Sequence, residues 1–175
     1  INGTTGARLD IGLRLFLDIE SGANIDRIET LLEPDGHFVF EAVRYDPSFI
    51  YRLSTTYKNA LYVTIVDVSQ NDLETELTVY EPVHDVSVLS VSNASILLLQ
   101  SDSLGQYIWA FEVLDISNTS NRIFVPDAKP MNLLRFGLPT DAMDLSVETV
   151  LIGDVFQVDL GFAIAANVPP GDHQL

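Results

Sequence analysis

The sequence predicts an all-β fold built from two consecutive β-sandwich domains. Short runs of apolar, β-branched and aromatic residues alternate with polar ones along the whole chain, and turn residues separate them. No stretch carries a convincing amphipathic helix, and 47% hydrophobic residues in a chain of 175 provide for a sizeable core. Pro82 interrupts the pattern because proline cannot donate to a strand ladder, so we expect a first domain over residues 1–80 and a second over 81–175.

The first domain opens with a strongly alternating strand. Over residues 9–19 the apolar side chains at odd positions share one face, and Phe16 is the apolar residue on the other. Residues 25–32 fit a second strand less regularly, and a short helical turn is the alternative there. The remaining expected strands of this domain, apart from the one described next, are 49–56, 60–67 and 77–80, with a turn near Lys58-Asn59.

A tight turn is predicted at Asp35-Gly36, because glycine adopts positive φ and aspartate tolerates it. Residues 37–43 then alternate between apolar and polar side chains, which predicts a strand. Phe38 and Phe40 would fill the first core from this strand.

In the second domain the sequence predicts a hairpin between residues 86–91 and 95–100, turning through Ser92-Asn93-Ala94. Residues 106–116 follow as a long strand. The later expected strands are 122–125, 131–136, 150–158, 160–165 and one that starts at His173 after the Pro169-Pro170-Gly171 turn. We expect that last strand to be cut off, so that the second domain is truncated at its C-terminal end.

Composition excludes several kinds of function. With 9 basic and 25 acidic residues the net charge is −16, which opposes binding to nucleic acid or to anionic lipid. Solvation is the favoured interpretation of this charge, ahead of cation binding or a basic partner. The chain has no cysteine, so disulfides and thiolate chemistry are excluded. No apolar run is long enough to span a bilayer, and any membrane anchor would lie outside this chain.

Metal-binding patterns are sparse. His37, His84 and His173 each stand alone in sequence, without the short spacing of metal ligands, and are expected at the surface. Calcium is the one cofactor with candidate ligands, although both sets lack the EF-hand pattern. The candidates are Asp67, Ser69, Asn71 and Asp72, and a second acidic set of Asp141, Asp144 and Glu148.

Catalytic and recognition patterns are equally limited. Asp154 and Asp159 form a carboxylate pair of the kind a hydrolase uses, but 25 acidic residues produce such pairs by chance, and no nucleophile elbow or phosphate loop occurs. The sequence therefore predicts a protein that is not an enzyme. Tyr107, Trp109 and Phe111 alternate along one strand, where they favour a sandwich core over a sugar-stacking or partner-binding stripe. Asn-x-Ser/Thr sequons occur at Asn2, Asn93 and Asn118.

Residues 9–80 resemble a transthyretin-like or carboxypeptidase-regulatory-like module. The resemblance rests on the alternating strand at 9–19, the turn and strand at 31–40, and the strands at 51–54 and 60–63. Residues 79–85, 113–118, 134–139 and 168–173 resemble a β-domain that follows such modules in uncharacterised bacterial surface proteins. These resemblances imply immunoglobulin- or transthyretin-like sandwiches and no assigned site residue.

The expected function is that of a non-catalytic, extracellular or cell-surface structural module, a subunit or accessory of a surface assembly such as a filament, sheath or membrane complex. Its partners would be other protein chains, or copies of itself that pair at open sheet edges. A carbohydrate- or calcium-binding adhesion module is the alternative. A hydrolase that uses a carboxylate pair is a second, less favoured alternative.

Overall fold

The structure, a computed structural model, is all-β. It describes residues 1–9, 12–68, 74–101, 104–105, 107–127, 133–149 and 151–175. Within these ranges the one helical element is a 3₁₀ turn, η1, at Val86–Val88. The chain divides into two compact units, Ile1–Glu81 and Pro82–Leu175. Each unit is described by itself.

Unit 1 is built on a four-stranded antiparallel sheet in the order β2-β1-β3-β4. The strands are β1 (Arg14–Ser21), β2 (Asn24–Leu31), β3 (Ile50–Tyr57) and β4 (Ala60–Ile65). Lys58 and Asn59, both with positive φ, form the tight turn between β3 and β4. Residues 25–32 therefore lie mostly in a strand and not in a helical turn.

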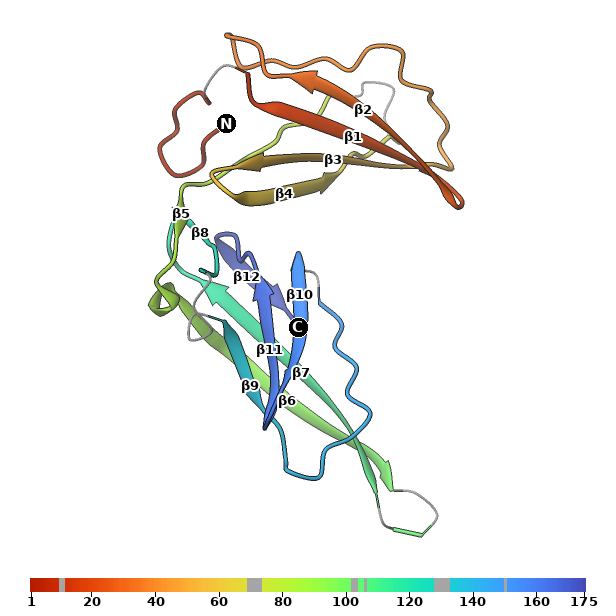
Figure 1. The fold of residues 1–175 in the computed structure, drawn as a ribbon, viewed down its shortest axis with the longest axis vertical. Coiled ribbons are helices and arrows are strands. Elements are labelled where there is room, and N and C mark those ends of the chain that lie inside the picture. Colours follow the sequence, from red (N-terminus) through yellow and green to blue (C-terminus); the bar gives the residue numbers. More distant parts are fainter. Residues whose placement is uncertain (10–11, 69–73, 102–103, 106, 128–132, 150) are drawn as a thin grey trace. The chain divides into compact units, whose positions relative to one another are not determined.

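One face of this sheet carries the core of unit 1. Leu15, Leu17 and Ile19 of β1 are buried, as their alternation predicts, and Leu17 pairs with the fully buried Leu53 of β3. The long connection after β2 and the segment after β4 cover this face (Figure 1). The covering side chains are Phe40, Val43, Phe49, Val66 and Val68.

The opposite face of the sheet is polar and is held by ion pairs. Asp18 and Arg27, which are paired across β1 and β2, approach to 2.6 Å, and the Arg27 guanidinium lies 5.3 Å from the centre of the Phe16 ring. Glu20 and Arg52 lie 2.7 Å apart across β1 and β3. Strong alternation thus gives β1 one apolar covered face and one charged solvated face.

Two expected strands of unit 1 are absent. The turn at Asp35-Gly36 forms, with φ of 90° at Gly36, but residues 37–43 are not a strand, and Ala42 breaks the extended course with φ of 55°. Phe40 reaches the core without pairing to the sheet, where β1 already has β2 and β3 as neighbours. Residues 77–80 make only an isolated parallel bridge, between Asn2 and Val79.

Unit 2 contains two three-stranded antiparallel sheets. One has the order β12-β7-β6, from β12 (Gly171–Gln174), β7 (Ile108–Asn118) and β6 (Leu89–Ser101). The other has the order β10-β11-β9, from β10 (Gly153–Val158), β11 (Gly161–Ala166) and β9 (Leu134–Gly137). A short parallel pair joins β5 (Pro82–Val83) to β8 (Ile123–Phe124).

The two sheets contribute to one core. Ile116 of β7 packs in the same buried cluster as Leu134 of β9 and Phe162 and Ile164 of β11, and Phe124 of β8 is fully buried among them. The β6–β7 hairpin runs past the ends of β9, β10 and β11 (Figure 1). Only the part of the hairpin nearest this core is therefore covered.

The hairpin corrects one expectation for this unit. Residues 92–94 do not turn, because β6 is one continuous strand of 13 residues and η1 replaces the start of the expected strand at 86–91. A β-bulge between Val91 and Asn93 absorbs the extra residue. Ser92-Asn93-Ala94 also lacks the glycine that favours a two-residue turn.

Candidate functional site

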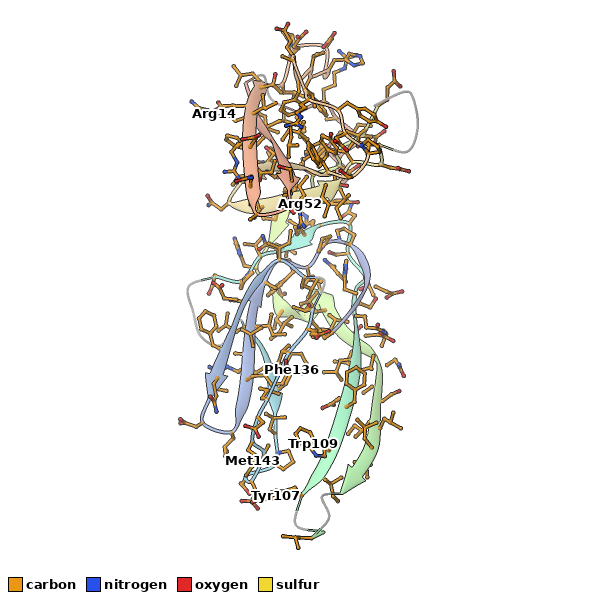
Figure 2. All side chains as sticks on the ribbon, turned by 90° about the vertical axis from the view of Figure 1, so that its right-hand side faces the viewer. Arg14, Arg52, Tyr107, Trp109, Phe136 and Met143 are labelled. Atoms are coloured by element: carbon orange, nitrogen blue, oxygen red, sulfur yellow. The ribbon has the colours of Figure 1, made fainter. Side chains whose placement is uncertain are left out.

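The most distinctive surface of the molecule lies on the β6–β7 hairpin, chiefly on its outer half, and is apolar and exposed. We call the following residues the apolar hairpin surface: Val91, Ile96, Leu97, Leu98, Leu99, Leu104, Tyr107, Ile108, Trp109 and Phe111. Each of these side chains is more than half exposed. Figure 2 shows Tyr107 near the end of the hairpin and Trp109 further along β7. Large contiguous apolar patches of this kind mark interaction sites in soluble proteins.

Strand pairing places these residues on both faces of the hairpin. Ile96 pairs with Glu112 and Leu98 with Ala110, whereas Leu97 pairs with Phe111 on the opposite face. Directly paired residues of an antiparallel ladder share a face, and successive residues alternate. The hairpin therefore lacks the polar face that β1 presents to solvent, and the same surface is apolar on both sides.

Polar contacts hold the inner half of the hairpin in shape. At the first bulge the Ser92 hydroxyl donates to the Asp115 carbonyl oxygen at 3.1 Å, and the Asn93 side-chain amide donates to the Asp115 carboxylate at 3.0 Å. At the end of β7 the buried Asn118 amide donates to the carbonyl oxygens of Arg122 and Val168, both at 2.8 Å. These contacts fix where the hairpin leaves the core.

The stripe of Tyr107, Trp109 and Phe111 corrects the expectation of a second core. Trp109 is 60% exposed and Phe111 is 59% exposed. The core of unit 2 uses Phe162 instead, whose ring stacks on that of Phe136 with centres 4.9 Å apart. In Figure 2 the indole of Trp109 lies on the side of β7 toward Phe136, without joining that core.

A shallow cavity of about 580 Å³ lies on the second sheet of unit 2. Its walls include Met143, Leu145, Val155 and Phe162, and Asp144 is the titratable side chain among them. Val155 and Phe162 belong to adjacent strands of one sheet. Ser146 and Gln157 also line this cavity, so its walls are mixed polar and apolar, and no hydrogen bond between Ser146 and Asp144 is present in the described part of the chain.

Charge is distributed unevenly around the hairpin. The sequence contains no lysine or arginine between Lys58 and Arg122, and β6 contains no ionisable residue at all. Glu112 and Asp115 supply the acidic groups of β7. The apolar hairpin surface is thus uncharged along β6 and has acidic neighbours along β7.

Histidines and carboxylates are not gathered into a metal site in the residues that the structure describes. His84 Nδ1 lies 2.8 Å from the Val125 carbonyl oxygen, and His173 Nε2 lies 2.9 Å from that of Pro169. His37 is exposed in unit 1. The three rings therefore stay separate, each with a local backbone partner or solvent.

The calcium candidates fall into two groups. Ser69, Asn71 and Asp72 lie outside the described residues, and Asp67 is exposed beside them. Asp141, Asp144 and Glu148 lie in the long connection before β10 without forming a ligand cluster there. The carboxylate pair of Asp154 and Asp159 is exposed, at either end of β10.

The three sequons differ in accessibility. Asn2 and Asn118 are buried, and their side-chain amides donate to Glu81 and to carbonyl oxygens. Asn93 is exposed on β6. Among the sequons, Asn93 is thus the one whose side chain is exposed to solvent in the folded chain.

Glu81 is the most strongly perturbed carboxyl of the described residues. It accepts hydrogen bonds from Lys58 at 2.6 Å, from Tyr57 at 2.8 Å and from Asn2 at 2.9 Å. These bonds lower the pKa of Glu81 to about 2. The cluster fastens the start of the chain to the end of unit 1.

The apolar hairpin surface was missed in the sequence, although its signal is present. Ile96-Leu97-Leu98-Leu99 is a continuous apolar run, which is typical of a strand buried on both faces. A strand with one face in solvent alternates, as β1 does. The apolar run of β6 is thus the sequence signal of this surface, although both faces of the strand are exposed in the structure.

No helix in the described part of the chain is long and apolar enough to cross a membrane. No protein-family model, curated protein or solved structure matches the chain. The apolar hairpin surface therefore carries the functional proposal.

Proposed function

We propose that this protein is a non-catalytic, extracellular or cell-surface structural module that joins other protein chains through its apolar hairpin surface. It would act as a subunit or accessory of a surface assembly. The observation that carries the proposal is the exposure of ten large apolar side chains on one hairpin of an otherwise strongly acidic protein. Water solvates such a surface poorly, and covering it is the main source of free energy in protein association.

The position outside the cell rests on the resemblance of residues 9–80 to transthyretin-like modules and of the second half to bacterial surface domains. Among the segments that carry the first resemblance, residues 31–40 contain the expected turn but not the expected strand. The strands at 51–54 and 60–63 are present in β3 and β4. We propose in addition that both units are sandwich-like and that each unit has an open sheet edge.

A photo-crosslinking amino acid placed at position 109 in the producing cell tests the proposal. Tyr45, 53% exposed in unit 1, provides the matched control position. We expect a covalent adduct with another protein chain from position 109 and little adduct from position 45. Equal adduct formation at both positions, or none at either, would contradict an assembly through the hairpin.

Exposed aromatic rings also favour a second candidate, a carbohydrate-binding adhesion module. Trp109, Tyr107 and Phe111 offer flat surfaces that can stack on sugar rings. A glycan array probed with the wild-type chain and with Trp109→Ala tests it. Binding that is lost in Trp109→Ala supports this candidate, and an array without signal removes it.

A further inference from the structure

Strand β6 is an unusually unprotected sheet edge. It pairs only with β7 among the strands that the structure describes, and it is 13 residues long. Natural edges are protected by charged side chains, proline, β-bulges or short length, and of these β6 has two β-bulges. β6 has no proline and no ionisable side chain, and between the bulges at Ser92 and Leu99 it offers an uninterrupted stretch at Asn93–Leu98.

The apolar hairpin surface is large enough for a stable dimer. With 150–250 Å² for an aromatic side chain and the lower end of that range for the aliphatic ones, the exposed parts on the two faces of the hairpin together amount to roughly 1,000 Å². A monomeric protein rarely exposes more than about 300–600 Å² in one apolar patch. A stable interface of standard size buries about 800 Å² on each partner. One hairpin therefore supplies the area that half of such an interface requires.

We propose that the partner of this surface is a second copy of the chain, joined edge to edge through β6. This inference rests on the proposed function and names its partner. The two β6 strands would pair antiparallel about a two-fold axis and continue the sheet as β12-β7-β6-β6-β7-β12. Strand addition of this kind combines main-chain hydrogen bonds with side-chain contacts on both faces.

Symmetry restricts the register of this pairing. Paired residues share a face, so a two-fold axis perpendicular to the sheet passes between the two strands, midway between one residue and the same residue of the second copy. Ser95 lies at the middle of Asn93–Leu97, within the stretch between the bulges, and its small side chain permits close approach. Asn93 then pairs with Leu97 of the second copy, and Ala94 with Ile96.

Charge favours a copy of the chain over a basic partner along this edge. The absence of ionisable groups on β6 means that two copies meet there without like charges opposite one another. The net charge of −16 on each copy still repels at a distance. We therefore expect added salt to strengthen the dimer, whereas salt would weaken binding to a basic partner.

Sedimentation velocity on the purified chain tests the inference with two matched substitutions. Ile96 on β6 is 65% exposed, and Ile65 on β4, an edge strand of the sheet of unit 1, is 66% exposed. From about 1 to 300 µM we expect a monomer–dimer equilibrium in the wild type and in Ile65→Lys. Ile96→Lys should weaken the dimer at least about tenfold, although it makes the net charge of each copy less negative.

A cysteine at position 95 gives an independent readout, because the chain has none of its own. Under mild oxidation Ser95→Cys should form a covalent dimer at least about tenfold faster than Ala23→Cys in the exposed β1–β2 turn. Equal rates would overturn the pairing through β6. A wild type that stays monomeric throughout the concentration range would overturn the second copy as partner.

The cross-link at position 109 separates this inference from the proposed function. An adduct with the mass of two chains supports both. An adduct of another mass supports the proposed function and overturns the second copy as partner. Absence of any adduct contradicts both.

Discussion

Strand β1 of unit 1 and the β6–β7 hairpin of unit 2 are both rich in apolar residues, yet they meet solvent in opposite ways. In β1 the apolar side chains Leu15, Leu17 and Ile19 are buried, and its other face is held by pairs such as Asp18 with Arg27. In the hairpin, Leu97 and Leu98 point to opposite faces and both are exposed.

This difference shows how much of its own surface each unit covers. The connection after β2 folds back over the sheet of unit 1 and supplies Phe40, Val43 and Phe49 to its core. No described segment does this for the outer half of the hairpin, where Ile96 and Trp109 remain exposed. The buried strand contributes to the stability of its own chain, whereas in our proposal the exposed hairpin serves association with another chain.

The largest expected contrast is between two leucine substitutions. Leu53→Ala in β3 removes a fully buried side chain and should lower the free energy of unfolding of unit 1 by about 3–4 kcal/mol. Leu98→Ala removes a side chain that is 64% exposed and should change stability by less than about 0.5 kcal/mol. Urea unfolding followed by circular dichroism measures both at low protein concentration. Similar losses in the two variants would remove the distinction between the two regions.

A second contrast lies inside unit 2, between two asparagines of the hairpin. Asn118→Ala deletes a buried amide that donates to two carbonyl oxygens, and should cost about 2–3 kcal/mol. Asn93→Ala deletes an exposed amide with one partner and should cost about 0.5 kcal/mol. Thermal unfolding of the two variants compares them directly. An equal effect would mean that the buried and the exposed amide contribute alike to stability.

The third prediction concerns the Asp35-Gly36 turn, which lies near the start of the connection that covers the sheet of unit 1. Gly36 has φ of 90°, so Gly36→Val should cost about 1–3 kcal/mol through backbone strain. An added Cβ would meet no atom within 4 Å, so the cost is conformational and not steric. Gly36→Asn, which tolerates positive φ, should cost less. A melting temperature that is the same in all three proteins would contradict this account of the turn.

The smallest expected effect is the dependence of unit 1 stability on pH. The pKa of Glu81 is lowered to about 2 from an ordinary value near 4.5, chiefly by the hydrogen bond from Lys58. Its contribution is complete above pH 4.5 and is lost as pH falls from there toward 2. We expect about 1–2 kcal/mol from this cluster, because Glu81 is partly exposed. Glu81→Gln should flatten the acid limb of the stability curve, and an unchanged curve would contradict the assignment.

The predictable parts of the fold were those set by local pattern. The alternation of Leu15, Leu17 and Ile19 identified β1, and the Lys58-Asn59 turn joined the strands expected around it. The strand expected at 37–43 was wrong. Side chains of this segment pack on the sheet, but the positions beside β1 are already occupied by β2 and β3. Strand pairing is a property of the whole sheet and not of the segment.

The place of the candidate site was not predicted, and its role in pairing with another chain remains a prediction. An open sheet edge that pairs with another chain was expected, and the alternation of Tyr107, Trp109 and Phe111 was noticed. Their placement in a core was wrong, because alternation states that residues share a face and not that anything covers it. The outer hairpin is left uncovered because β6 is longer than the strands of the second sheet.

The central claim is that the hairpin is exposed in a single chain and covered by a second. Trp109 is the sole tryptophan of the protein, so acrylamide quenching of its fluorescence reports on this surface alone. We predict a red-shifted, readily quenched emission at high dilution, and a partly blue-shifted, less readily quenched emission as the chain is concentrated, because Trp109 lies on β7, one strand away from the β6 seam. An indole that is protected at every dilution would contradict the claim, since Trp109 would then belong to the core of its own chain.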